Sequence, residues 1–280
     1  MESGSKINLF LRVTGRRSDG YHTLESLFLP LESPSDQVEL DFGAAPGITL
    51  DCCDPALSGA ANLAYRAAQL YAEASGIAPS WSIRLEKRVP VAAGLGGGSA
   101  DAAVVLTLLE NRYGVLGAES LKLLARRLGA DVPFFLYRRP MVGRGVGDEL
   151  TPLEEPLPEL HVLLVNPGFP VSAKWAYEHL VSGAGEGPAL ECLLAALYAR
   201  DRRGVAENLR NDLAPALWNK FPLLGMIRDE LAALGALAVE ISGSGPTLFA
   251  LFADGEALTW AAEKLRSKHD DFKVFATEYE

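Results

Sequence analysis

Apolar and polar residues alternate along the first part of the chain. The alternation from Ile7 to Val13 predicts a strand that carries its apolar side chains on one face. Lys6 and Asn8, two positions apart, then share the opposite face. A lysine close to a chain end is usually solvated, so this pattern alone does not assign Lys6 a function.

A second strand is expected directly after the first. Asp19-Gly20 is typical of a tight turn, and residues 21–31 again suit an extended strand. The N-terminal segment is therefore predicted to be a hairpin, with Tyr21 and His22 just past its tip. From the pattern alone, these two side chains would be hairpin packing residues.

Helical spacing of apolar residues alternates with short strands through the rest of the chain. Glycines after residues 75 and 128 mark helix ends, and a final helix and strand are expected at the C-terminus. The other predicted helices cover residues 62–75, 99–113, 120–128, about 173–180, 189–200 and 222–234; the predicted strands cover 82–89, 161–165 and both sides of 243–245.

The stretch from Asp148 to Glu159 differs from its surroundings. It is acidic and contains prolines at positions 152, 156 and 158, which suit neither a helix interior nor a central strand. With 280 residues the chain is long enough for two domains. We therefore expect a first domain over residues 1–155, a second over 156–280, and a cleft between them.

Composition narrows the classes of function. Apolar residues make up 49% and charged residues 22% of the chain, which is ordinary for a globular protein. The net charge of −10 argues against nucleic acid as a partner, but a few local cations and backbone amides can still hold a small phosphate compound. No signal peptide or membrane span is expected.

Three cysteines offer neither a metal-ligand spacing nor an even disulfide framework. Cys52 and Cys53 are adjacent, and Cys192 is far away. This usage predicts a protein of a reducing compartment, and we expect a cytoplasmic location.

The strongest local signal is a glycine-rich run between a predicted strand and a predicted helix. Four glycines fall within the five positions 94–98. Glycine lets backbone N–H groups approach a ligand closely, and the following helix adds its positive end, so this pattern predicts a phosphate-binding loop. A flexible surface loop is the simpler alternative, but such loops usually contain more polar residues.

Two familiar phosphate loops do not match this run. No Gly-Lys-Ser or Gly-Lys-Thr ending occurs in the chain, which excludes the usual P-loop. The dinucleotide fingerprint nearly fits, but its acidic partner would be Glu119, beside a helix start and not at a strand end.

Residues 90–103 closely resemble the second motif of the GHMP kinase superfamily. Further segments in the same order resemble the branch that phosphorylates a cytidine-diphosphate-linked methylerythritol on its 2-hydroxyl, in the non-mevalonate route to isoprenoid precursors. These segments are residues 5–9, Asp19-Gly20-Tyr21-His22, Gly129-Ala130-Asp131-Val132-Pro133-Phe134-Phe135 and Ile241-Ser242-Gly243-Ser244-Gly245.

The resemblance implies an α+β fold in two domains with the active site in the cleft between them. The N-terminal domain would be an α/β domain like that of ribosomal protein S5, and the C-terminal domain would hold an antiparallel sheet. Lys6 and Asp131 match the catalytic lysine and the general base, although an isolated aspartate at such a position is usually a helix cap or turn residue.

The same resemblance assigns binding residues. ATP would be the phosphoryl donor, with Mg²⁺ carried by the nucleotide and no metal site made by protein ligands alone. ATP-binding residues would be Val91, Ala92, Ala93, Gly94, Leu95, Gly96, Gly97, Gly98, Ser99, Ala100 and Asp101; substrate-binding residues would be Asn8, Tyr21, His22, Tyr177, Gly243, Ser244 and Gly245.

The resemblance also implies how the cytosine would be held, and it shows one departure from the family pattern. Tyr21, His22 and Tyr177 would hold the cytosine of a substrate that contains a cytidine diphosphate group, by stacking and hydrogen bonding. Ala100 departs from the family pattern, which usually has a second serine after the glycines, so Ser99 must supply the hydroxyl alone. Weaker ATP binding is the expected consequence.

Three alternatives stay open at this point. Another GHMP kinase acting on homoserine, mevalonate or a sugar would not need the Tyr21-His22 pair. A catalytically silent nucleotide-binding regulator would not need both Lys6 and Asp131. An RNA-associated protein of similar first-domain architecture is disfavoured by the net charge of −10 and by the absence of a basic run in the sequence.

Overall fold

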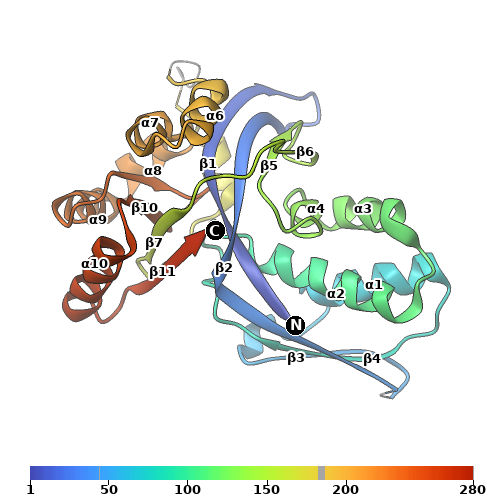
Figure 1. Ribbon diagram of the computed structural model, residues 1–280. Coiled ribbons are helices and arrows are strands. Elements are labelled where there is room, and N and C mark those ends of the chain that lie inside the picture. The colour runs from blue at the N-terminus through green and yellow to red at the C-terminus, as the bar shows by residue number, and fades with distance from the viewer. Residues whose placement is uncertain (44, 182–186, 280) are drawn as a thin grey trace. The chain divides into compact units, whose positions relative to one another are not determined.

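The computed structural model describes residues 1–43, 45–181 and 187–279, which form two compact units (Figure 1). The long strands β1 (Glu2–Arg16) and β2 (His22–Phe42) each contribute residues to both units. The first unit comprises Met1–Ser5, Pro34–Val89 and Gly96–Arg138; the second comprises Lys6–Ser33, Pro90–Leu95 and Arg139–Glu280. Because neither unit is one continuous stretch, the domain boundary placed after residue 155 stays a prediction.

In the first unit, helices pack on one side of a small sheet (Figure 1). Strand β4 (Ser80–Glu86) pairs in parallel with β3 (Gly47–Cys52) and antiparallel with the second half of β2. The short helix η1 (Pro55–Leu57) follows β3. The helices are α1 (Leu63–Ser75), α2 (Gly97–Tyr113), α3 (Gly117–Leu128) and α4 (Val132–Phe135).

Small side chains allow α1 and α2 to approach each other closely. Ala64, Ala67 and Ala68 of α1 are fully buried, as are several alanines of α2. Their core also contains Trp81 of β4. Helix α1 begins where the Asn62 side chain accepts a hydrogen bond from the Ala64 N–H and ends at Gly76, as expected from the sequence.

The second unit contains the hairpin of β1 and β2 and a separate four-stranded sheet. Strand β8 (Arg210–Asn211) pairs in parallel with β1, while β5 (Met141–Arg144) pairs with β2 and with β6 (Glu149–Pro152). The four-stranded sheet is antiparallel in the order β11-β7-β10-β9. Its strands are β7 (Leu160–Asn166), β9 (Ala238–Ile241), β10 (Leu248–Phe252) and β11 (Lys273–Tyr279).

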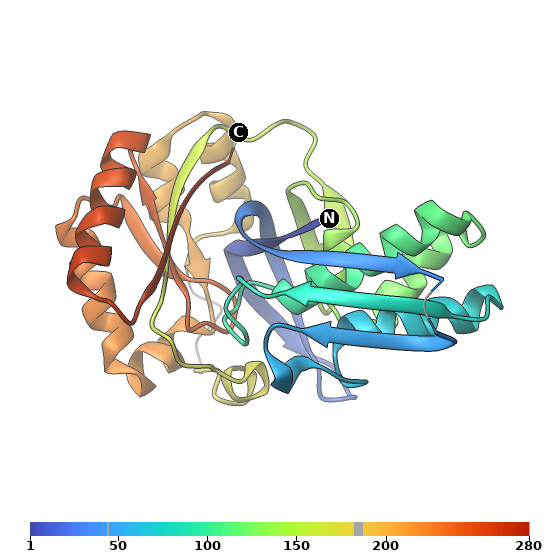
Figure 2. The ribbon, with the colours of Figure 1, turned by 90° about the horizontal axis from the view of Figure 1, so that it is seen from below.

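Helices cover one face of this antiparallel sheet, as Figure 2 shows for its red and orange segments. Leu224, Ile227 and Leu231 pack into the same core as the sheet residues Leu163 and Leu248. The helices of the second unit are α5 (Ala173–Glu178), α6 (Leu190–Tyr198), α7 (Arg202–Asn208), α8 (Ala214–Lys220), α9 (Pro222–Ala233) and α10 (Gly255–Lys268). No helix in the described residues has the length and apolar character needed to cross a membrane.

Most predicted elements are confirmed, but some boundaries differ. Helix α2 begins at Gly97 and not at Ser99, because Gly96 adopts a left-handed conformation at the cap and the last glycines form the first turn. The strand predicted for residues 21–31 continues to Phe42, and the one predicted for 82–89 ends at Glu86. Short elements without a clear apolar period were not predicted. These are β3, η1, β5, β6, β8, α4, α7 and α8.

Candidate active site

Lys6 is buried on β1, with only 4% of its surface exposed. Its Nζ donates hydrogen bonds to Asn8 Oδ1 at 2.7 Å and to the carbonyl oxygen of Gly94 at 3.0 Å. The contact with Asn8 confirms that the two side chains share one face of the strand. The expectation for an ordinary terminal lysine, a solvated ammonium, is therefore wrong for Lys6.

The Asn8 amide is fixed at both ends. Its Nδ2 donates to Ser26 Oγ at 2.8 Å, and that hydroxyl in turn donates to the Phe10 carbonyl at 2.7 Å. With Nδ2 engaged by β2, Oδ1 must face Lys6. The ammonium position is thus set by a chain of buried hydrogen bonds.

The glycine loop approaches Lys6 through Gly94. Gly94 has φ +78°, and a Cβ atom there would lie 2.0 Å from the Ser242 carbonyl oxygen. Ser242 Oγ also donates to the Gly94 carbonyl at 2.9 Å. Only glycine fits this position, where the loop meets the turn between β9 and β10.

That turn reaches the same place. Gly243 has φ +54°, and a Cβ atom there would lie 3.2 Å from both Lys6 Nζ and Asn8 Oδ1. Gly243, Ser244 and Gly245 do form a hairpin turn between antiparallel strands, as the simple reading of the sequence allowed. The turn also brings backbone next to the buried lysine, together with the glycine loop.

The remainder of the glycine loop forms the beginning of α2 in the first unit. Gly96 is the cap residue with φ +74°, and Gly97, Gly98, Ser99 and Ala100 make up the first turn. The first amides of a helix have no partner within the helix, and no acidic side chain lies in this turn. This end of α2 suits phosphate oxygens.

Asp131 lies in the first unit, at the start of α4. It occupies the cap position, but its carboxylate makes no capping hydrogen bond to that helix. The three following residues, Val132, Pro133 and Phe134, are buried. Asp131 is thus followed by a buried apolar turn, and its role as the general base stays a prediction.

Aromatic residues from two elements meet at the start of β2. The rings of His22 and Tyr177 stack with centroids 5.4 Å apart and planes 18° from parallel. Partial burial, with the nearby Arg16 guanidinium, lowers the pKa of His22 from its ordinary value. Tyr21 keeps 68% of its surface exposed. The structure thus brings His22 and Tyr177 together and leaves the Tyr21 ring accessible.

Asn211 was missed by the sequence analysis. Its Nδ2 donates to the carbonyl oxygens of Ile241 at 2.8 Å and Gly243 at 2.7 Å, and its Oδ1 accepts the Leu213 N–H at 3.0 Å. Because Asn211 also pairs with Leu11 of β1, it connects the strand that carries Lys6 to the glycine turn. Three consecutive polar residues, 210–212, before an apolar run were the only signal in the sequence.

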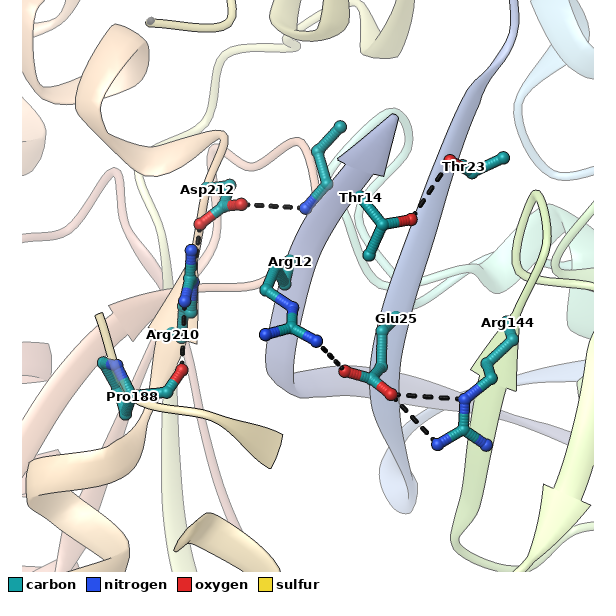
Figure 3. Close-up of polar contacts among 9 residues, drawn as sticks. Arg12, Thr14, Thr23, Glu25, Arg144, Pro188, Arg210 and Asp212 are labelled. Atoms are coloured by element: carbon teal, nitrogen blue, oxygen red, sulfur yellow. Dashed lines mark hydrogen bonds and ion pairs between the residues drawn. The ribbon is translucent and has the colours of Figure 1, made fainter. Parts of the chain in front are cut away.

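The strands around Asn211 are joined by charged side chains (Figure 3). Asp212 accepts hydrogen bonds from Arg210 at 2.7 Å and from the Val13 N–H at 2.8 Å. On the other side of β1, Glu25 pairs with Arg12 at 2.7 Å and with Arg144 at 3.0 Å. These contacts fix β1 between its neighbours β8 and β2.

One group of possible metal ligands occurs among the described residues. Glu159, His161 and Glu278 place one ligand atom each within 4.8 Å of one another. However, the two nitrogens of His161 face different carboxylates, with Nδ1 3.2 Å from Glu278 and Nε2 3.9 Å from Glu159. A single ion cannot use both nitrogens, and a hydrogen bond between His161 Nδ1 and Glu278 accounts for the closer of the two contacts.

Family models match both halves of the chain. The model described as GHMP kinases N terminal domain matches residues 62–139, and the one described as GHMP kinases C terminal matches residues 193–271.

Curated relatives match over nearly the full length. The 4-diphosphocytidyl-2-C-methyl-D-erythritol kinase of Nitratidesulfovibrio vulgaris (strain DP4) is 40% identical over 278 residues, covering 98% of this chain and 96% of that protein. The protein of the same name from Syntrophotalea carbinolica is 41% identical over 276 residues, with the same coverage.

Two solved structures match the chain over nearly its full length. A crystal structure of 4-(cytidine 5'-diphospho)-2C-methyl-D-erythritol kinase matches with a TM-score of 0.85 and 39% identity, covering 99% of this chain and 98% of that one. The homoserine kinase of Cytophaga hutchinsonii matches with a TM-score of 0.74 but only 23% identity, covering 99% of this chain and 95% of that one. The second likeness shows a shared fold alone.

Proposed function

Because the chain belongs to the 4-diphosphocytidyl-2-C-methyl-D-erythritol kinase family of the GHMP kinases, we propose that it transfers a phosphoryl group from ATP to the 2-hydroxyl of that substrate. The observation that carries the proposal is the setting of Lys6. Its ammonium is buried among Asn8, the Gly94 carbonyl and the Gly243 turn, where three family motifs meet.

Positioning and charge stabilisation supply most of the catalysis in phosphoryl transfer. Asp131 takes the proton of the substrate hydroxyl as its oxygen bonds to the γ-phosphorus of ATP. The bond from that phosphorus to the bridging oxygen breaks, and ADP leaves. Lys6 stabilises the negative charge that develops on the transferred group.

The two parts of the glycine loop have different roles in this proposal. The first amides of α2 donate hydrogen bonds to phosphate oxygens, as the positive end of the helix favours. Bound with the nucleotide, Mg²⁺ would supply neutralisation of the phosphate charge. Ser99 is the one hydroxyl side chain in the first turn of α2 and suits a metal-bound phosphate, whereas Ala100 offers no ligand.

The cytidine end of the substrate binds at the aromatic residues. Tyr21 has an accessible face for stacking on a pyrimidine, and Tyr177 supplies a second ring held against His22. The lowered pKa of His22 favours a neutral imidazole, which offers one donor and one acceptor to the base edge. These roles, the domain division after residue 155 and a cytoplasmic location belong to the same proposal.

The test is ADP release by the purified protein with ATP, Mg²⁺ and 4-diphosphocytidyl-2-C-methyl-D-erythritol. Homoserine, mevalonate and galactose serve as alternative acceptors, and Asp131→Asn serves as the catalytic control. ADP formed only with the cytidyl substrate, and lost in the variant, supports the assignment and the base. ATP binding without turnover would favour a silent nucleotide-binding regulator instead.

A further inference from the structure

Three charged side chains are buried together in the first unit. One of them, Asp101, ends the run that was expected from the sequence to bind ATP, and its carboxylate pairs with Lys87; the other two were not assigned to the site. Asp36 of β2 is 1% exposed, Asp101 of α2 is 2% exposed, and the side chain of Lys87, just after β4, is 10% exposed. Lys87 Nζ pairs with both carboxylates, at 2.6 Å in the case of Asp101 Oδ2. We call these three residues the loop clasp.

Asp36 holds the chain where it leaves β4 toward the glycine loop. Its Oδ1 accepts the backbone N–H groups of Arg88 at 2.5 Å and Val89 at 2.8 Å, while Oδ2 accepts Lys87 Nζ. One carboxylate therefore fixes three consecutive residues. The glycine loop begins immediately after them.

The other end of the loop is held by the same group. Lys87 connects Asp36 to Asp101, which lies just over one turn into α2. A Cβ atom at Gly97 would lie 2.8 Å from Val89 Cγ1 and 3.2 Å from Asp36 Oδ2. The residues before and after the loop are thus packed in contact, at a distance that only glycine allows.

The loop clasp is expected to contribute little to the stability of the core. Two carboxylates share one ammonium, so the group carries a net negative charge, and Asp101 Oδ1 has no hydrogen-bond partner among the described residues. Burial raises the pKa of Asp101 to about 6, against the opposing effect of Lys87. Buried charge of this kind often stabilises a fold less than apolar residues of similar volume do.

We propose that the loop clasp is a positioning device that sets the separation of the two ends of the glycine loop and thereby its affinity for ATP. The proposal rests on the proposed function, since it takes the loop to bind ATP. Asp36, Lys87 and Asp101 act through the backbone of the loop and are positioning residues. Their loss affects ATP more than the phosphoryl acceptor.

The test compares ATP dissociation constants and steady-state kinetics at pH 8 for the unsubstituted protein and Asp36→Asn. Asparagine keeps an acceptor for the backbone N–H groups but loses the charge that holds Lys87. Because the two ends of the loop are then no longer held at a fixed separation, ATP should bind about tenfold more weakly or worse. The KM for the cytidyl substrate should change less than twofold.

Asp41→Asn is the matched control. Asp41 also lies on β2 and pairs with a cation of β4, Arg84, at 3.0 Å, but its side chain is 62% exposed and is not part of the loop clasp. This variant should bind ATP within twofold of the unsubstituted protein. Equal ATP affinity in Asp36→Asn and Asp41→Asn would overturn the proposal.

A second variant covers the case in which Asp36→Asn does not fold. Asp101→Asn removes a buried charge and leaves Asp36 paired one to one with Lys87, so we expect a higher melting temperature together with at least threefold weaker ATP binding. A merely structural group would move both quantities in the same direction or leave ATP binding unchanged, and either result overturns the proposal. If the unsubstituted protein fails to bind ATP, the proposed function fails first.

Discussion

Two buried lysines in this chain lie in different places relative to the glycine loop. Lys6 donates to the Asn8 amide and to the Gly94 carbonyl, and it lies next to the Gly243 turn. Lys87 is held by the carboxylates of Asp36 and Asp101, where the chain enters and leaves the loop. We therefore expect Lys6 to stabilise the transferring phosphoryl group and Lys87 to fix the ends of the loop.

The titration of Asp101 should make the stability of the protein depend on pH. Its pKa is about 6 in the folded protein against an ordinary value of 3.8, because burial outweighs the attraction of Lys87, and Asp36 adds repulsion. A raised pKa favours the folded state below pH 3.8, and this contribution is lost as the pH rises to about 6. Above pH 6, the charged carboxylate lowers the free energy of unfolding.

Asp101→Asn should therefore melt at a higher temperature than the unsubstituted protein at pH 7.5, by about 2–4 °C for each kcal/mol recovered. The difference should fall to about half at pH 5 and become small only near pH 4, below which Asp101 is protonated in both the folded and the unfolded state. Melting curves between pH 4 and pH 8 measure it, with the exposed Asp41→Asn as the control. A difference that does not change with pH would contradict the assignment of this titration to Asp101.

Asn211 also acts as a single side chain. An aspartate of the same size would replace the amide donor by an oxygen facing the carbonyls of Ile241 and Gly243. Asn211→Asp should lower kcat/KM by about a hundredfold, because displacement of the Gly243 turn by 1 Å is enough for such a loss. Steady-state kinetics at saturating ATP measure the effect.

Asn208→Asp is the control for that prediction. Asn208 also donates its amide to a carbonyl, that of Gly204 at 2.7 Å, but both residues belong to α7. It should lower the melting temperature slightly and leave kcat/KM within about twofold. Equal losses of kcat/KM in the two variants would show that Asn211 has no special role in positioning the turn.

At the scale of elements, the glycine run serves two structures. Gly94 belongs to an irregular loop in the second unit, where the Ser242 carbonyl excludes any side chain. Gly97 and Gly98 belong to α2 in the first unit. Glycine therefore serves different structural purposes at different positions of the same short run.

Substitution by alanine should therefore have different effects on stability at Gly94 and at Gly98. Gly94→Ala should lower the melting temperature by several degrees, since its Cβ would overlap a backbone oxygen at a positive φ. At Gly98 the nearest atom to a Cβ is Leu63 Cδ1 at 3.9 Å, so the position has room for alanine. Gly98→Ala should keep the melting temperature or raise it, because alanine is up to about 1 kcal/mol more favourable than glycine within a helix. Thermal unfolding followed by circular dichroism measures both; similar losses would contradict the two environments.

The sequence predicted elements that have a long apolar period, such as α1 and the β1–β2 hairpin. It also paired Lys6 with Asn8, because side chains two apart on a strand share a face. The loop clasp and Asn211 were not predictable. The contacts of the loop clasp join residues 14 to 53 positions apart, and Asn211 contacts carbonyls 30 and 32 positions away. Such contacts depend on tertiary packing and leave no periodic signal.

For the whole molecule, the net charge of −10 gives no general attraction for an anionic nucleotide. Recognition of ATP and a cytidine diphosphate compound must then come from local groups: the start of α2, the ammonium of Lys6 and the aromatic rings at the start of β2. The family membership and these local groups lead to the same reaction, phosphorylation of one particular hydroxyl.

The most direct test of this account locates the phosphoryl group in the product by ³¹P NMR without proton decoupling. The 2-carbon of the substrate carries a methyl group and no hydrogen, so a 2-phosphate should appear as a new unsplit phosphomonoester resonance while the γ-phosphate of ATP disappears. Asp131→Asn should give no such resonance. A new phosphomonoester resonance split by coupling to carbon-bound protons, or consumption of ATP without any phosphomonoester, would contradict the proposed reaction.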